Sequence, residues 1–464
     1  MEKNDRPLSL EKRLVDHLYA VDYGDLSPDL VDLCKLFILD SLGTTIAGAK
    51  APGCPEVVSL VRSWGGSPVS TIMVYGGKVA PPFAALANSM MMHALDFDDT
   101  LDASALHTFV TVLPAALSTA EYSGKTNGKR LITALVLGVD LICRLSLGIR
   151  RPLSWIRTAT CGSFGAAATA AKILGLDRDG ISDALGIVYS QTSGNAQGLV
   201  EGRLVKRMQP GFASQSGVIS ASLAQAGITG SRGFLEGAYG FFRLYEQGDY
   251  DAAAVIADLG EHYCIKDLSI KPYPACRMTH ASIDAALRLR EHMRVTHDGP
   301  HGIEKITVTV SKMVADMVGR PFVIGDNPQV DAQFSIPYTV SVALLRGEVF
   351  LEDFETEVIQ DDQVISLAQN VEVMIDSSLP EKDILHSRME IHGKEGGILE
   401  ETVDCPLGNP GNPMDMDRCK EKFKRCLVYQ GFDPHEPRVT EILSMVEGIE
   451  NVGEIGELTA LMEM

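Results

Sequence analysis

Residues 162–174 read GSFGAAATAAKIL, and this segment indicates the kind of fold that the chain adopts. It is apolar nearly all round and rich in glycine and alanine, whose small side chains let neighbouring helices approach closely. Apolar segments of the same character occur at 82–94, 111–121, 131–147, 181–193 and 213–226. Together with amphipathic stretches at 10–19 and 30–42, they predict a large domain of packed helices over residues 1–268.

The pattern changes near residue 268. Ile306, Val308 and Val310 alternate with threonines, which predicts a half-buried strand. The alternation recurs at 371–375, a hairpin is expected at 389–403, and helices are expected at 281–293 and 330–345. Helical patterns return at 420–427 and 438–445. The predicted fold class is therefore mainly α with an α+β insertion: an all-helical domain of residues 1–268 and 404–464, and a smaller α/β domain of residues 269–403.

Composition narrows the function classes. The 464 residues include 41 Lys and Arg against 61 Asp and Glu, a formal charge of −20, which argues against nucleic acid or an anionic membrane as a partner. The apolar stretches are too short to cross a bilayer, and the N-terminal residues lack the apolar core of a signal peptide. Nine cysteines without a CxxC pair are typical of thiols in a reducing compartment. We expect a soluble, cytoplasmic protein.

The densest polar cluster within apolar surroundings is HALDFDDT, residues 93–100, followed by His107. One interpretation is a set of helix-end hydrogen bonds. A second is magnesium and diphosphate binding of the isoprenoid-synthase type by a DDxxD pattern at 98–102, for which the chain offers only 361–362 as a second acidic motif. A third is proton chemistry, in which a carboxylate such as Asp96 orients a histidine such as His107.

Cations for a negatively charged substrate follow at two places. Lys206 comes after a glycine-containing loop and just ahead of a helix whose first turn is expected at 213–215, where backbone N–H groups favour an anion; two solvated charges at 206–207 are the alternative. Lys271, Arg277 and His280 lie at the junction of the two predicted domains. Cys276 and His280 have helical spacing, but without a second Cys/His pair no metal site is expected.

Six motifs occur in the order found in the MmgE/PrpD family, which the chain resembles from about residue 10 to 430. They are HALDFDDT (93–100), TATCGSFGAAATAAKILGLD (158–177), VKRMQPGFASQSG (205–217), KPYPACRMTHASIDA (271–285), DAQFSIPYTVSVALL (331–345) and PLGNPGNPM (406–414). The resemblance implies a homodimer with a helical domain, a smaller lid domain, an active site between them, and no metal or organic cofactor. It implies the catalytic residues Asp96, His107, Lys206 and His280, and the substrate-binding residues Thr100, Lys271 and Arg277.

The resemblance also implies a lyase acting on a small di- or tricarboxylate, with dehydration of the 2-methylcitrate type placed ahead of decarboxylation of the cis-aconitate type. Ile156 and Arg157 stand where many relatives have a histidine–proline pair, and Gln209 replaces another common histidine. An isoleucine cannot donate a proton. The reaction therefore transfers less safely than the fold, and an epimerase of a dicarboxylate or a non-catalytic member stays an alternative. The functional cations, including Arg157, predict a small basic cleft on an acidic protein.

Overall fold

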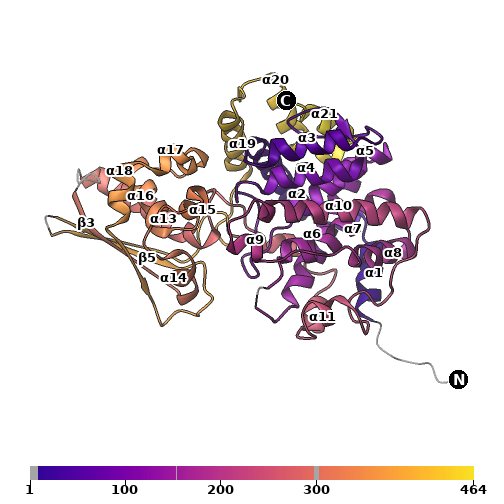
Figure 1. The fold of residues 1–464 in the computed structure, drawn as a ribbon, viewed down its shortest axis with the longest axis horizontal. Coiled ribbons are helices and arrows are strands. Elements are labelled where there is room, and N and C mark those ends of the chain that lie inside the picture. Colours follow the sequence, from indigo (N-terminus) through magenta and orange to yellow (C-terminus); the bar gives the residue numbers. More distant parts are fainter. Residues whose placement is uncertain (1–8, 153, 297–301, 395) are drawn as a thin grey trace. The chain divides into compact units, whose positions relative to one another are not determined.

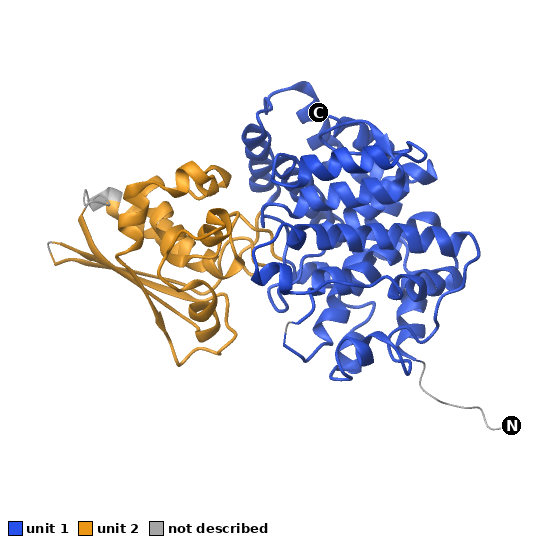
Figure 2. Ribbon diagram, viewed as in Figure 1, with its two compact units in different colours: residues 1–268, 415–464 blue, residues 269–414 orange. Residues whose placement is uncertain are grey.

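The computed structural model describes residues 9–152, 154–296, 302–394 and 396–464. The chain divides into two compact units, which we call unit 1 (residues 1–268 and 415–464) and unit 2 (residues 269–414) (Figure 2). Helix accounts for 57 % of the structure and strand for 9 %, which confirms a mainly α fold with some β structure. Within the described ranges, no helix combines the length and the apolar character needed to span a membrane.

Unit 1 is helical (Figure 1). Its helices are α1 (Leu10–Ala20), α2 (Pro28–Gly48), α3 (Cys54–Trp64), α4 (Pro81–His93), α5 (Phe109–Ser123), α6 (Gly128–Leu147), α7 (Arg157–Leu174), α8 (Arg178–Tyr189), α9 (Gln197–Val200), α10 (Val205–Gln225), α11 (Phe241–Leu244), α12 (Ala252–Val255), α19 (Met416–Gln430), α20 (Pro437–Glu447) and α21 (Gly456–Leu461). Strands β1 (Ser70–Thr71) and β2 (Lys78–Val79) form a short antiparallel pair. The C-terminal helix α19 packs against α2.

Helix α7 carries the glycine- and alanine-rich segment and packs against α5, α6 and α10. A Cβ atom at Gly165 would lie 2.8 Å from the carbonyl oxygen of Gly138 in α6. A Cβ atom at Gly217 of α10 would lie 2.6 Å from the backbone carbon of Ala166. Larger side chains at these contacts would force the helix backbones apart. The prediction that 162–174 forms a central, closely packed helix is confirmed.

One helix boundary in unit 1 was predicted wrongly. Helix α10 begins at Val205, not near 213, so Lys206 lies in its first turn and the N–H groups of 213–215 lie inside the helix. Pro210 and Gly211 resemble a helix break in the sequence, but Pro210 sits within α10. A Cβ atom at Gly211 would lie 2.8 Å from the carbonyl oxygen of Leu86, so this glycine serves the contact with α4. The anion site expected at 213–215 is therefore wrong.

Unit 2 combines a four-stranded sheet with helices. Its elements are α13 (His280–Thr296), β3 (Ile303–Val310), α14 (Lys312–Val318), α15 (Pro328–Gln333), α16 (Ile336–Arg346), α17 (Thr356–Ile359), α18 (Asp362–Ala368), β4 (Val371–Ile375), β5 (Ser387–Gly393) and β6 (Ile398–Val403). The strand order is β4-β3-β5-β6. Strand β3 pairs in parallel with β4, and the pairs β3–β5 and β5–β6 are antiparallel. The three predicted strand regions are confirmed, although Glu395 of the expected hairpin turn lies outside the described residues.

The sheet is covered by α13, which packs on β5 and β6, and by α16, which packs on β4. Apolar residues from these elements, such as Ile306, Val308 and Met389, form one core. The helix expected at 330–345 is two helices, because the side chain of Ser335 accepts a hydrogen bond from the N–H of Tyr338 and so caps a new helix at Ile336. Residues 404–414 belong to unit 2.

Candidate active site

The acidic cluster lies in the loop between α4 and α5 of unit 1. Asp98 and Asp99 are almost completely buried. Asp96 has a φ of 54°, in the left-handed region that costs a residue other than glycine about 1–2 kcal/mol. Such strain persists only where the surrounding structure holds it, and it is common at functional sites. The loop is thus a tightly constrained segment that presents several ionisable side chains.

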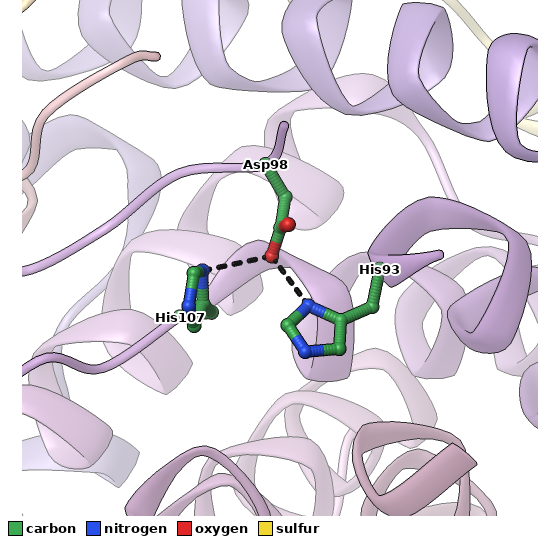
Figure 3. Close-up of side chains that lie close together, drawn as sticks. All are labelled: His93, Asp98 and His107. Carbon is green, nitrogen blue, oxygen red and sulfur yellow. Dashed lines mark hydrogen bonds and ion pairs between the residues drawn. The ribbon is translucent and has the colours of Figure 1, made fainter. Parts of the chain in front are cut away.

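Asp98 joins two histidines through one oxygen. Its Oδ2 lies 2.9 Å from Nδ1 of His93 and 2.9 Å from Nδ1 of His107 (Figure 3). Burial alone would raise the pKa of Asp98, but His107 and His93 outweigh it and hold that pKa well below its usual range. Burial lowers the pKa of His93 to about 4, against the opposing effect of Asp98. At neutral pH, Asp98 is therefore ionised and His93 is neutral.

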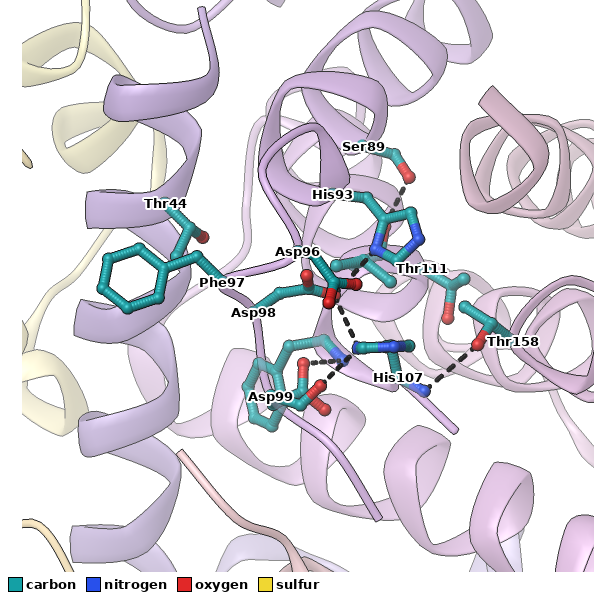
Figure 4. Close-up of polar contacts among 12 residues, drawn as sticks. Thr44, Ser89, His93, Asp96, Phe97, Asp98, Asp99, His107, Thr111 and Thr158 are labelled. Carbon is teal, nitrogen blue, oxygen red and sulfur yellow. Dashed lines mark hydrogen bonds and ion pairs between the residues drawn. The ribbon is translucent and has the colours of Figure 1, made fainter. Parts of the chain in front are cut away.

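The hydrogen bonds of His107 fix which ring nitrogen carries its proton. Nδ1 lies 2.6 Å from the carbonyl oxygen of Asp99, besides its contact with the Asp98 carboxylate. Both neighbours are acceptors, so Nδ1 must carry a hydrogen, and Nε2 of the neutral ring carries a lone pair. The backbone N–H of His107 donates to Oγ1 of Thr158, at the start of α7 (Figure 4). This is the geometry of an oriented general acid or base.

The carboxylate that orients His107 differs from the one expected from the sequence, which was Asp96. The structure gives it to Asp98, and Asp96 instead lies 3.2 Å from Nζ of Lys206. The periodicity of a sequence cannot show which of the two carboxylates faces His107, because the left-handed backbone at Asp96 changes the direction of the chain within the loop. Thr100, expected to bind substrate, follows in the same loop and is buried.

Asp99 caps helix α5. Its carboxylate accepts hydrogen bonds from the N–H and Oγ1 of Thr108 and from the N–H of Phe109. Burial, together with neighbouring Asp98, raises its pKa to about 6, and the three donors favour the ionised form at neutral pH. In unit 2, Asp361 pairs with Arg346 and caps α18. With the two histidines on Asp98, these contacts occupy three of the carboxylates that the DDxxD hypothesis assigned to magnesium, namely Asp98, Asp99 and Asp361, and they argue against that hypothesis.

Lys206 and Arg207 are not two solvated surface charges. Both are half-buried at the start of α10. Arg207 donates to the carbonyl oxygen of Pro52, and burial lowers its pKa although nearby Cys54 and Asp96 oppose this. Lys206 is also close enough to His93 to disfavour a second positive charge there. The site in unit 1 therefore places a lysine, a carboxylate and an oriented imidazole within one cluster.

The positions that depart from the family pattern have structural partners. Arg157 donates to the carbonyl oxygen of Arg151 and is close to the buried Glu246. Gln209 clamps the glycine-containing loop, because its side-chain amide accepts from the N–H of Asn195 and donates to the carbonyl of the same residue. No pattern in a single sequence predicts this amide clamp, since it joins positions 14 residues apart through a side chain.

Lys271, Arg277 and His280 lie in unit 2. His280 is fully buried; its Nδ1 accepts a hydrogen bond from Arg277 at 3.1 Å, and its Nε2 donates to the carbonyl of Ala275 at 3.3 Å. The ring is therefore neutral, with the proton on Nε2. Arg277 also donates to the carbonyl of Leu407 and to Oγ of Ser269. Lys271 is almost completely buried as well. The side chains of His280 and Arg277 are therefore each fixed by at least two hydrogen bonds.

Among the residues that the structure describes, two groups of side chains have the spacing of metal ligands. His93, Asp98 and His107 form one, and His262, Cys264 and Asp267 form the other. In the first group, a metal ion would have to replace the hydrogen that Nδ1 of His107 donates to Asp98 and Asp99. The hydrogen bonds account for the observed geometry of this group by themselves.

Comparison with known proteins places this site in a family. The MmgE/PrpD N-terminal domain matches residues 12–253, and the MmgE/PrpD C-terminal domain matches residues 273–446. The chain belongs to the MmgE/PrpD family.

Curated relatives match over nearly their full length. A cis-aconitate decarboxylase of Aspergillus terreus is 28 % identical, over 94 % of this chain and 92 % of the relative. The human cis-aconitate decarboxylase is 25 % identical, over 98 % and 95 %. The 2-methylcitrate dehydratase of Escherichia coli (strain K12) is 23 % identical, over 95 % and 94 %. These relatives are decarboxylases and dehydratases, and the chain is a lyase of this family.

Proposed function

We propose that the protein decarboxylates a small tricarboxylate, with cis-aconitate as the first substrate to test. The observation that carries the proposal is His107, whose Nδ1 is held by Asp98 while Nε2 has no hydrogen-bond partner among the described residues. The neighbouring Lys206–Asp96 pair supplies a cation for a carboxylate. The two cis-aconitate decarboxylases named above are 28 % and 25 % identical to this chain and the dehydratase is 23 % identical, so decarboxylation is preferred here to the dehydration expected from the sequence alone.

The chemistry of such a substrate suits these residues. The carboxylate on the CH2 carbon of cis-aconitate is β,γ-unsaturated, so it can leave as CO2 when its C–C bond breaks. That electron pair forms a new terminal double bond, and the pair of the original double bond moves to the CH carbon. This carbon lies next to a second carboxylate, which delocalises the developing negative charge, and it finally accepts a proton.

His107 is the proposed proton donor to that carbon. When Nε2 carries the proton, the ionised Asp98 at Nδ1 compensates the positive charge of the ring. Lys206 is the proposed cation for the charge that develops on the adjacent carboxylate. Asp96 holds the ammonium group in place in the absence of substrate. Each of these tasks needs only groups that unit 1 contains.

The remaining parts of the proposal come from the family. Thr100, Lys271 and Arg277 bind substrate carboxylates, His280 takes part in proton transfer, and unit 2 works as the lid domain. The protein acts as a cytoplasmic homodimer. The neutral, buried ring of His280 favours an orienting part for this residue over a primary proton donor.

The test is an assay of the purified protein with cis-aconitate and with 2-methylcitrate, in ordinary and in deuterated water, read by CO2 release and product mass. Loss of CO2 with one deuterium bound to carbon is the expected result; His107→Asn should abolish it, and Lys206→Met should lower its rate at least tenfold. Loss of water from 2-methylcitrate without CO2 would overturn the proposal in favour of a dehydratase. Deuterium exchange without loss of mass would indicate an epimerase, and no turnover of either acid would contradict the proposal.

A further inference from the structure

Lys422 of helix α19 contacts the loop of residues 94–108 between α4 and α5, which we call the active-site loop, although it lies more than 300 positions later in the sequence. Its ammonium group lies 2.6 Å from Oδ1 of Asp40 in α2 and 2.9 Å from the carbonyl oxygen of Phe97. The same group stands 3.6 Å from the centroid of the Phe97 ring. The side chains of Lys422 and Asp40 are 4 % and 1 % exposed, so the ion pair is buried.

Phe97 lies in the sequence between Asp96 and Asp98, the two carboxylates of the proposed site that contact Lys206 and the histidines. On one side, Asp96 has the left-handed backbone and pairs with Lys206. On the other side, Asp98 binds both imidazoles. A donor that fixes the carbonyl of Phe97 fixes the peptide plane leading into Asp98, and so limits the directions in which this carboxylate can point.

Stability alone is a weak reason for such an arrangement. A buried ion pair loses the hydration of both charges, and an apolar pair of similar volume often stabilises a protein equally well. An apolar side chain at position 422 could fill the same space, but it could not donate to the carbonyl of Phe97. The feature that only the lysine supplies is therefore the hydrogen bond to the loop, with Asp40 compensating its charge.

We propose that Lys422 is a positioning residue, which acts through the backbone of Phe97 to hold Asp98 and its two histidines in the catalytic arrangement. The kinetic test of this inference rests on the proposed function. A spectroscopic measurement on the histidines tests the role of Lys422 independently of that function.

The test compares Asp40→Asn/Lys422→Met, which removes both charges together, with Lys172→Met as a matched control. Lys172 of α7 is also a partly buried lysine, and it donates to the carbonyls of Leu18, Tyr19 and Val21. It lies 14 residues along α7 from Thr158, or about 21 Å at 1.5 Å per residue. Loss of a lysine–carbonyl clamp is common to both variants, but only one clamp touches the active-site loop.

Protein with ¹⁵N-labelled histidine reports the imidazoles directly, with the His107 signals assigned by comparison with His107→Asn. We expect the double variant to shift the Nδ1–H signals of His93 and His107 and to lower kcat for cis-aconitate at least tenfold, with a smaller change in KM. Lys172→Met should leave both readouts unchanged even if it lowers Tm. Lys422→Arg, which keeps the charge and donor groups, should restore part of the activity.

Unchanged histidine signals in the double variant would overturn the inference, as would a kcat within twofold of the wild type. If wild-type protein does not turn over cis-aconitate, the proposed function fails, and the histidine signals still decide the inference about Lys422. If the double variant does not fold, the single variant Lys422→Met is compared with Lys422→Arg: Nδ1–H signals that shift in Lys422→Met and stay nearer the wild type in Lys422→Arg support the inference, and unchanged signals in Lys422→Met overturn it.

Discussion

Replacing Asp98 by asparagine should remove the negative charge that orients both histidines. In the wild type, one ionised oxygen accepts from Nδ1 of His93 and from Nδ1 of His107, each at 2.9 Å. The amide oxygen of an asparagine could still accept from both rings, but it is neutral, and its NH2 group would then take the place of Oδ1, a buried atom without a hydrogen-bond partner among the described residues. The variant therefore either buries an unsatisfied donor or turns its amide, and a turned amide presents a donor to the rings, so that His107 must turn or move its hydrogen to Nε2 and lose the lone pair there.

The size of the effect follows from these contacts. Loss of the correct tautomer and of the charge that compensates a protonated imidazole typically lowers kcat by about 10²–10⁴. That factor corresponds to about 3–5 kcal/mol of transition-state stabilisation. The measurement is kcat for CO2 release from cis-aconitate at pH 7, with Tm recorded to show that the variant is folded.

Asp99→Asn is the matched control, because Asp99 is the next residue and equally buried, but its carboxylate caps α5. Its loss should cost about 1–2 kcal/mol of unfolding free energy and change kcat much less. The reasoning would be refuted if Asp98→Asn kept kcat within threefold of the wild type, or if Asp99→Asn lowered kcat by as much.

Three further results are expected. Lys206→Ala should raise KM and lower kcat for a carboxylate substrate, each about tenfold or more; unchanged steady-state kinetics would contradict its role. Gly165→Ala should lower the unfolding free energy by about 1–3 kcal/mol, because its Cβ would lie 2.2 Å from a side-chain carbon of α6, whereas Gly453→Ala, with no neighbour within 4 Å, should not. His93→Gln should change how the free energy of unfolding depends on pH between about 4 and 6.5. The unfolded chain binds a proton between the usual pKa of 6.5 and the folded value of about 4, so wild-type stability falls by up to about 3 kcal/mol as the pH drops through this window. Asp99, raised to about 6, opposes this trend in both proteins, so the difference between them in urea unfolding is the quantity to measure; a pH-independent difference would exclude the effect.

Local patterns in the sequence predicted most of the elements. The alternation of Ile306, Val308 and Val310 with threonines identifies β3, because a period of two places one row of side chains in a core. The glycine- and alanine-rich composition of 162–174 identifies α7 as a central helix, because small side chains let neighbouring helices approach closely. Where a single side chain decides, as with the Ser335 cap between α15 and α16, the pattern of apolar residues runs through the break undetected.

The site was predicted less completely than the fold. His107, Asp96 and Lys206 were expected to be functional, but the pairing of carboxylates with their partners was not foreseen. It depends on the left-handed backbone at Asp96, and spacing along the chain does not reveal that conformation. The contact between Phe97 and Lys422 joins residues 325 positions apart, and one sequence contains no signal for it.

The discontinuity of unit 1 has a consequence for synthesis on the ribosome. Residues 269–414 must be made before α19 exists, a delay of about 7–30 s at about 5–20 residues per second. Until then, the face of α2 that receives α19, where a Cβ atom at Gly43 would lie 3.3 Å from the Cα of Phe423, stays uncovered. The nascent helical unit therefore exposes an apolar surface to chaperones for most of that interval. The loop that contains Phe97 also acquires its contact with Lys422 only after unit 2 has been made.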